Sequence, residues 1–145
     1  MDEELAKRRA ERRERAEEHR RAQDGRREQE SLKAQVLIDQ FVERAIAAGV
    51  PTEELTARPW SGRGRYRTGV VGWYLRLDRS VGVDPAGGYY VLTVPPVRLG
   101  RRRAVTVDPT PPPLQVGEGA RDGESMPLAQ LLQLRLEWPE SPAGP

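Results

Sequence analysis

The stretch that decides the fold is LIDQFVERAIAAGVP, residues 37–51. Its apolar residues recur at spacings of three and four, the pattern of a helix with one buried face. Gly49 suits the left-handed position that follows a helix, Val50 can add a hydrophobic contact, and Pro51 cannot continue the helix. We therefore expect a helix that runs from Ser31 to about Ala48 and docks on a core. Its apolar face comprises Leu37, Ile38, Phe41, Val42, Ala45 and Ile46.

Residues 1–30, which precede this helix, are highly charged and poor in apolar residues. We expect them to form a solvent-exposed helical arm, supported by pairs such as Glu11 with Arg15 at i,i+4. No a/d seam recurs, so a coiled-coil dimer is not expected. Glycine costs a helix about 1 kcal/mol relative to alanine, so fraying or a break is expected near Gly25. The arm contains equal numbers of cations and anions. The ten cations are Lys7, Arg8, Arg9, Arg12, Arg13, Arg15, Arg20, Arg21, Arg26 and Arg27, and the ten anions are Asp2, Glu3, Glu4, Glu11, Glu14, Glu17, Glu18, Asp24, Glu28 and Glu30.

Because these opposite charges are interspersed, they should cancel beyond the Debye length of about 8 Å at physiological salt. The arm is therefore expected to contribute little to the attraction of an anionic partner.

Residues 66–116 have the pattern of a short-stranded sheet. Val71, Trp73, Leu75 and Leu77 alternate with Gly72, Tyr74, Arg76 and Asp78, which predicts a strand with Trp73 in the core and Tyr74 exposed beside Arg76. Residues 81–83 and 89–94 would be the next strands of an antiparallel meander, joined by the turn at residues 84–88. Residues 104–107 and 114–116 could add short edge strands.

The last helix is marked by Ser125 as a cap, by Pro127 in its first turn and by a leucine stripe at positions 128, 131, 132 and 136. The fold class expected is α+β, with a long N-terminal helix, a meander of three to five strands and a C-terminal helix packed on the sheet. The chain then divides into the arm at residues 1–30, a small α+β domain at residues 31–138 and a disordered tail at residues 139–145.

Arginine is concentrated in the middle of the chain. Residues 60–104 contain nine arginines against only Asp78 and Asp84, a net charge of +7 within a chain of net charge +2. Arginines on a glycine-rich loop can contact phosphates, and neighbouring aromatic rings can stack on bases. The alternative is that the loop at residues 61–69 is only a solvated connector. The candidate anion-binding residues are Arg63, Arg65, Tyr66, Arg67, Tyr74, Arg76, Arg101, Arg102 and Arg103.

Other chemistries find little support in the sequence. The chain has no cysteine and one histidine, His19, so metal, thiol and triad sites are not expected. The glycine-rich run at residues 117–123 has its third glycine one position late for a dinucleotide fingerprint, and no βαβ unit can follow it. We expect no enzyme activity and no cofactor. No signal peptide or membrane span is recognisable, so a cytoplasmic protein without membrane contact is expected.

The runs GWYLRLDRS (residues 72–80), YYVLTV (residues 89–94), PPL (residues 112–114) and GES (residues 123–125) resemble a family of small, uncharacterised actinobacterial proteins. The resemblance covers roughly residues 34–136 and omits the arm. It implies no activity, ligand or catalytic residue.

Two functional hypotheses follow. The first is a non-enzymatic binding module whose basic, aromatic-rich surface at residues 60–103 contacts an anionic partner, RNA or DNA before others. The second is a protein–protein interaction adaptor, in which the charged helix serves as a spacer. The oligomeric state is left open by the sequence.

Overall fold

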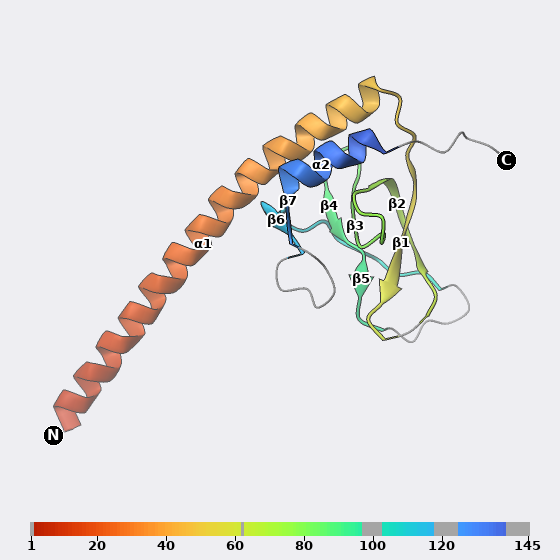
Figure 1. Cartoon of the computed structure of the whole chain (residues 1–145). Helices are drawn as coiled ribbons and strands as arrows, with labels where there is room; N and C mark the ends of the chain where they lie inside the picture. The colour runs from red at the N-terminus through yellow and green to blue at the C-terminus, as the bar shows by residue number, and fades with distance from the viewer. Residues whose placement is uncertain (1, 62, 97–102, 118–124, 139–145) are drawn as a thin grey trace.

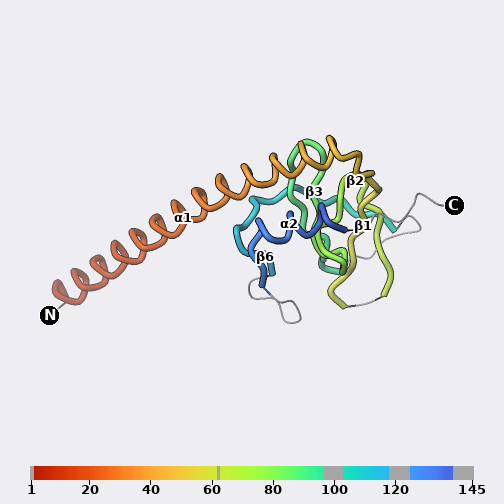
Figure 2. Tube along the Cα trace, turned by 45° about the horizontal axis from the view of Figure 1, so that its top comes forward, coloured from red at the N-terminus to blue at the C-terminus, as the bar shows by residue number. Residues whose placement is uncertain are grey.

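The computed structural model describes residues 2–61, 63–96, 103–117 and 125–138. Helix α1 (Asp2–Ala47) projects far beyond a small domain built from short strands and the helix α2 (Leu128–Glu137), as Figures 1 and 2 show. At 1.5 Å per residue, α1 is about 69 Å long. The α+β fold class, with a helix at each end of the described chain, is therefore confirmed. The tail expected at residues 139–145 lies outside the described residues.

A mixed five-stranded sheet forms the centre of the domain, in the order β4-β3-β2-β1-β5. The neighbours from β4 to β1 pair antiparallel, as expected for a meander, whereas β5 pairs parallel to β1. The strands are β1 (Glu53–Pro59), β2 (Tyr66–Tyr74), β3 (Val81–Val83), β4 (Tyr89–Val91) and β5 (Thr93–Val94).

Both edges of this sheet come from one segment of chain, because β4 and β5 are separated only by Leu92. The Leu92 N–H donates to the Ser80 carbonyl at 2.8 Å, and its carbonyl accepts from the Arg58 N–H at 2.8 Å. The sheet therefore curls around a small apolar cluster of Leu55, Tyr74, Tyr90 and Leu92, all buried. Burial and the hydrogen bond that the Tyr90 hydroxyl donates to Asp84 raise the pKa of Tyr90 to about 12.

The larger core lies between the sheet and the two helices. Ala34, Ile38, Phe41, Val42 and Ala45 of α1 are buried there, and the rings of Phe41 and Trp73 meet edge to face at 5.8 Å between centroids. The Trp73 indole N–H donates to the Val50 carbonyl at 3.1 Å. The core position expected for Trp73 is confirmed. The other members of this core are Leu75, Val81, Val83, Tyr89, Val116, Leu128, Leu131 and Leu132.

The end of α1 follows its sequence signal closely. Gly49 has a φ of 71°, and its N–H donates to the Ile46 carbonyl at 3.0 Å. The Val50 N–H donates to the Ala45 carbonyl at 2.9 Å, which completes a Schellman motif. The last helical residue is Ala47, one position before the expected Ala48.

The break expected near Gly25 is wrong, because α1 runs without interruption from Asp2 to Ala47. A single glycine costs about 1 kcal/mol, which raises the free energy of the helix without removing any backbone hydrogen bond. Residues 2–29 are all exposed, as expected of the arm.

Three strand expectations also need correction. Strand β1 was not anticipated. Strand β2 ends at Tyr74, so Leu77 is 84% exposed in the following turn, and Val71 is half exposed although it lies within β2. Residues 104–107 form only a bridge between Ala104 and Arg67, not a strand. Residues 114–116 do not join the main sheet, because β6 (Gln115–Val116) pairs with β7 (Met126–Pro127) as a separate ladder.

Ser125 does not cap α2. Its hydroxyl donates to Gln115 Oε1 across the β6–β7 pair, and Pro127 occupies the N-cap position without a side-chain hydrogen bond. The chain enters α2 directly from β7, and the Leu128 N–H donates to the Leu114 carbonyl at 2.7 Å. The leucine stripe at positions 128, 131 and 132 is buried as expected.

A substitution at Gly72 tests the pairing of β2 with β3. A Cβ built at Gly72 would lie 2.1 Å from the Val83 carbonyl oxygen, a backbone atom. We expect Gly72→Ala to lower the free energy of unfolding by about 3 kcal/mol, the upper part of the overpacking range, measured by urea unfolding followed by tryptophan fluorescence. The matched control is Gly25→Ala, where a Cβ meets nothing within 4 Å. The control should raise helix content and leave the urea midpoint unchanged. Equal midpoints for both variants would contradict the β2–β3 pairing.

Candidate nucleic-acid interface

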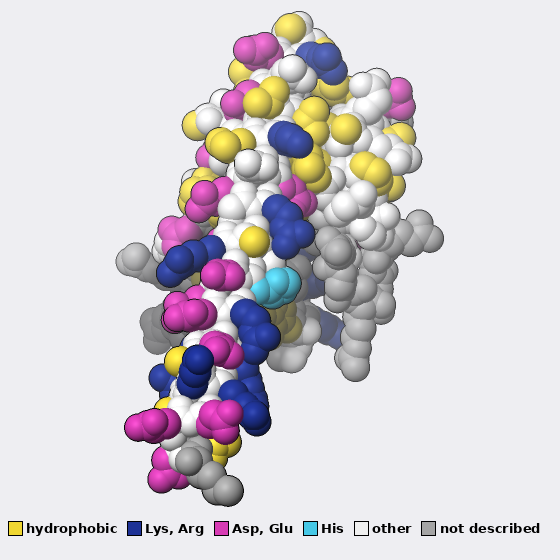
Figure 3. All heavy atoms as spheres, turned by 90° about the vertical axis from the view of Figure 1, so that its left-hand side faces the viewer, with side chains coloured by type: hydrophobic (Ala, Val, Ile, Leu, Met, Phe, Trp, Pro, Cys, Tyr) yellow, Lys and Arg dark blue, Asp and Glu magenta, His cyan; other side chains and the backbone are white. Residues whose placement is uncertain are grey.

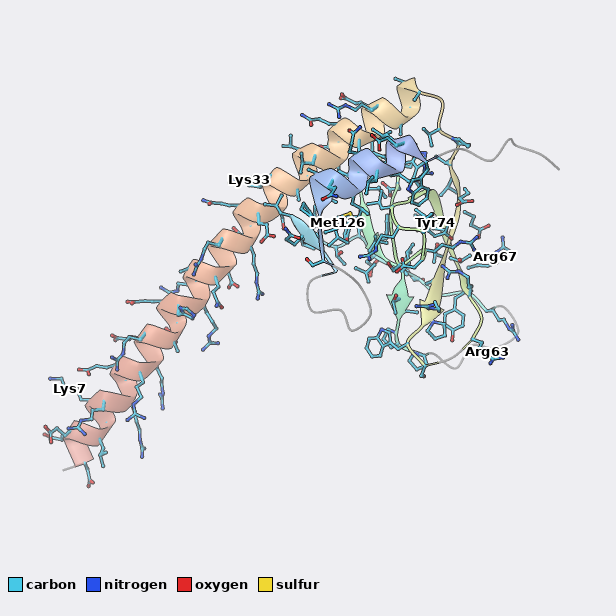
Figure 4. The ribbon with its side chains drawn as sticks, viewed as in Figure 1. Lys7, Lys33, Arg63, Arg67, Tyr74 and Met126 are labelled. Carbon is cyan, nitrogen blue, oxygen red and sulfur yellow. The ribbon has the colours of Figure 1, made fainter. Side chains whose placement is uncertain are left out.

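Among the described residues, several arginines lie on or next to the β1–β2 hairpin. In β1, Leu55, Ala57 and Pro59 are buried, and the alternate position Arg58 is exposed. Arg67 of β2 lies opposite Thr56. Figure 4 shows Arg63 and Arg67 pointing away from the domain, on the side remote from the arm. We call this set the hairpin cluster and define it as Arg58, Trp60, Arg63, Arg65, Arg67, Arg79 and Arg103.

Arg65 is held in place by hydrogen bonds. Its Nε donates to Thr56 Oγ1, and its Nη2 donates to the Thr56 carbonyl at 2.8 Å and to the Arg79 carbonyl at 3.5 Å. The side chain thus joins β1 to the turn that follows β2, and it is half-buried. Arg65 serves the fold first, so its substitution would confound a binding assay.

Arg67 pairs with Glu54 across the hairpin. Its Nε and Nη2 donate to the two Glu54 carboxylate oxygens at 3.1 and 3.3 Å, which raises the pKa of Arg67. The pair is exposed, so it stabilises the fold only slightly. The backbone of Arg67 also bonds the neighbouring segment: its N–H donates to the Arg103 carbonyl at 2.9 Å. Arg103 therefore lies beside Arg67, although Arg101 and Arg102 are outside the described residues.

Arg58 and Arg63 are exposed, and no hydrogen bond or ion pair is found for either side chain within the described chain. Trp60 stands close by at the end of β1, where its N–H donates to the Val94 carbonyl at 3.0 Å. Its side chain is 68% exposed, a large apolar area for a surface residue. Residues 58–63 thus carry two exposed guanidinium groups and one exposed indole.

Tyr74 and Arg76 do not form the exposed contact that the strand pattern suggested. Tyr74 is 6% exposed and its hydroxyl accepts from the Thr56 N–H at 2.8 Å, because the curled sheet encloses this face as well. Arg76 is half-buried and lies 3.9 Å from Asp78. Partial burial of Asp78 opposes ionisation, but hydrogen bonds from Ser80 and the charges of Arg76 and Arg58 lower its pKa. Tyr66 is half-buried at the start of β2.

Two members of the cluster have an unusual backbone. Arg79 and Arg103, with φ values of 61° and 42°, are the non-glycine residues with positive φ among those described. Such conformations cost about 1–3 kcal/mol and are concentrated at functional sites. The Arg79 guanidinium lies over the Tyr74 ring, 5.7 Å from its centroid.

Sequence reasoning missed Arg58 and Arg79 as site residues. The alternation of Leu55, Ala57 and Pro59 with Thr56 and Arg58 is a strand signal that could have revealed β1 and its exposed arginine. The position of Arg79 depends on the turn after β2. The sequence signal for this turn was Asp78 followed two residues later by Ser80, and the Ser80 hydroxyl donates to Asp78 Oδ1 at 2.6 Å.

The described residues line grooves both beside the hairpin cluster and away from it. One groove of about 760 Å³ lies between α1 and residues 111–113, and it is lined by Arg27, Glu28, Glu30, Ser31, Leu32, Gln35 and the three prolines. It is remote in sequence from the hairpin cluster and mixes both charges. Across the described residues, no group of three or more histidine, cysteine or acidic side chains could hold a metal ion. None of the described helices has the length and apolar character needed to cross a membrane.

Comparison of the chain with protein-family models, with curated proteins and with solved structures finds no match. The residues themselves therefore carry the functional argument.

The distinction between Arg65 and Arg63 can be tested by stability alone. We expect Arg65→Gln to lower the free energy of unfolding by about 1.5–3 kcal/mol, because hydrogen bonds from a charged donor to Thr56 are lost. Arg63→Gln, a matched loss of one exposed guanidinium, should change it by less than about 0.5 kcal/mol. Urea unfolding of both variants measures this difference. Equal effects would show that Arg65 is not a structural residue.

Proposed function

We propose that this chain is a non-enzymatic binding module that holds RNA or DNA by its phosphate backbone on the hairpin cluster. The observation that supports this most directly is that Arg58 and Arg63, whose exposed guanidinium groups have no hydrogen bond or ion pair within the described chain, flank in sequence the exposed indole of Trp60. Guanidinium groups bind phosphate with paired hydrogen bonds, and an indole can stack on any base.

The surrounding charges favour an anion. Six arginines lie in the cluster, and the carboxylates found to act on them are Glu54 on Arg67 and Asp78 on Arg58. Glu54 is hydrogen-bonded to Arg67, at the end of the hairpin away from Trp60. Within the described chain, no carboxylate is bonded to Arg63. Recognition by such a surface depends mainly on phosphates and is largely independent of sequence.

The test is the salt dependence of binding to a labelled 20-nucleotide single-stranded RNA and to the DNA of the same sequence, measured by fluorescence anisotropy. For Arg58→Gln/Arg63→Gln in the full chain, we expect the slope of log K against log salt to fall by about 1.4, because each lost phosphate contact contributes about 0.7 on a single strand. The control is Lys7→Gln/Arg21→Gln, which removes the same charge from exposed positions of α1. Its slope should stay close to that of the natural sequence.

Absence of binding to both nucleic acids at low salt, or a slope that the cluster variant leaves unchanged, would overturn the proposal. The protein-interaction adaptor would then become the better hypothesis, since the projecting α1 suits a spacer about as well as a binding element.

A further inference from the structure

The charges of the arm are sorted onto two sides of α1. Because the helix is continuous from Asp2, each side chain direction follows from 3.6 residues per turn. Eight of the arm's ten cations fall within about 160° of the helix circumference. They are Arg8, Arg9, Arg12, Arg13, Arg15, Arg20, Arg26 and Arg27, and we call them the basic side of the arm.

The acids occupy the opposite sector. Glu3, Glu4, Glu11, Glu14, Glu17, Glu18, Asp24 and Glu28 fall within the remaining part of the circumference, again over about 160°. Figure 3, which looks onto the arm from its outer side, shows dark blue side chains mainly along one edge of the helix and magenta ones mainly along the other. The cancellation expected from the balanced count concerns distances beyond the Debye length of about 8 Å, whereas close to the helix the two signs face different directions.

The arginines of the basic side are not neutralised within the chain. The ion pair found in the arm, among the described residues, joins Arg21 to Glu17 at 3.9 Å, and Arg21 lies in the acidic sector. None of the eight arginines of the basic side has a carboxylate oxygen within 4 Å in the described chain. Asp2 and Glu30 are the acids of the arm that fall within the sector of the basic side. Glu30 accepts a hydrogen bond from the Leu114 N–H at 3.1 Å.

The basic side continues the face by which α1 docks on the domain. Stepping back from the buried Ile38 and Ala34 by three or four residues leads to Glu30, Arg27, Gln23, Arg20, Ala16, Arg13 and Arg9. In Figure 4, long side chains ending in nitrogen lie along the underside of the arm, the side that leads to the domain. One stripe of the helix is thus apolar where it packs and basic where it is free.

We propose that the basic side of the arm is a second phosphate-binding surface, which contacts the same RNA or DNA that the hairpin cluster holds. This inference rests on the proposed function for the identity of its partner. From Arg8 to Arg27 the surface extends about 29 Å, long enough to follow several phosphates of one strand. The arm is then a binding element and not only a spacer.

A second copy of the chain fits this surface less well, although its acidic side has the complementary charge. Ion pairs between exposed side chains contribute only about 0–1 kcal/mol each, and the arm has no apolar seam to hold two helices together. A polyanion differs because each neutralised phosphate releases condensed counterions, which favours binding.

The test compares two double variants that remove the same charge from neighbouring positions on different sides of the full-length chain. Arg9→Gln/Arg20→Gln alters the basic side, and Lys7→Gln/Arg21→Gln alters the acidic sector. Glutamine has nearly the helix propensity of arginine and lysine, and circular dichroism checks that helix content is retained. With the labelled 20-nucleotide RNA, we expect the first variant to lower the salt slope by about 1.4 and the second to leave it nearly unchanged.

The outcomes separate this inference from the proposed function. A slope lowered by Arg58→Gln/Arg63→Gln but not by Arg9→Gln/Arg20→Gln would leave the function standing and overturn the role of the arm. Equal effects of the two arm variants would also overturn it, because net charge and not the basic side would then matter. A salt-sensitive dimer in sedimentation analysis that Arg9→Gln/Arg20→Gln abolishes would identify a second copy as the partner and overturn it as well.

Discussion

The contact between Phe41 of α1 and Trp73 of β2 is the interaction on which the rest of the structure depends. It joins the buried stripe of the helix to the centre of the sheet, with the rings edge to face at 5.8 Å. The Trp73 hydrogen bond to Val50 fixes the chain immediately after the Schellman motif, and therefore the point at which β1 begins. The direction of the whole of α1 follows from this docking, because the helix is continuous.

The consequence for function is geometric. A helix anchored along residues 34–45 and continuous to Asp2 cannot rotate its free part independently of its buried part. The arginines at positions 9, 13, 20 and 27 must therefore face the same side as Ile38 and Ala45. The second arginine set depends on the sheet: β1 presents Arg58 outward because Leu55 and Ala57 are buried in the curled interior. One fold thus positions two arginine surfaces that are separate in sequence.

Local signals predicted what they control directly. The spacing of Ile38, Phe41 and Ala45 predicted the buried face of α1, and Gly49 predicted where this helix ends. The leucines at positions 128, 131 and 132 predicted α2. The α+β class followed from the order of these patterns. The site was predicted less well: Arg63 and Arg103 lie where a partner could reach them, but Tyr74 is buried and Arg65 bonds Thr56.

The errors share a physical cause, which is the closure of the sheet on itself. Alternation along one strand assumes one buried face, yet residues 73–75 are enclosed on both sides by the helices and by the curled sheet. The parallel pairing of β5 with β1 depends on contacts between segments far apart in sequence, which no local pattern reports. The charge count of the arm is incomplete for a related reason, since a sum over residues discards the direction in which a helix points each side chain.

Hydrogen exchange of the full chain, measured alone and with a saturating 20-nucleotide RNA, tests the central claim most directly. The account predicts that backbone amides of residues 8–27 and of the β1–β2 hairpin gain protection when RNA is added, whereas those of α2 do not. Protection confined to α2 and the groove beside residues 111–113, or no change at either arginine surface, would contradict it.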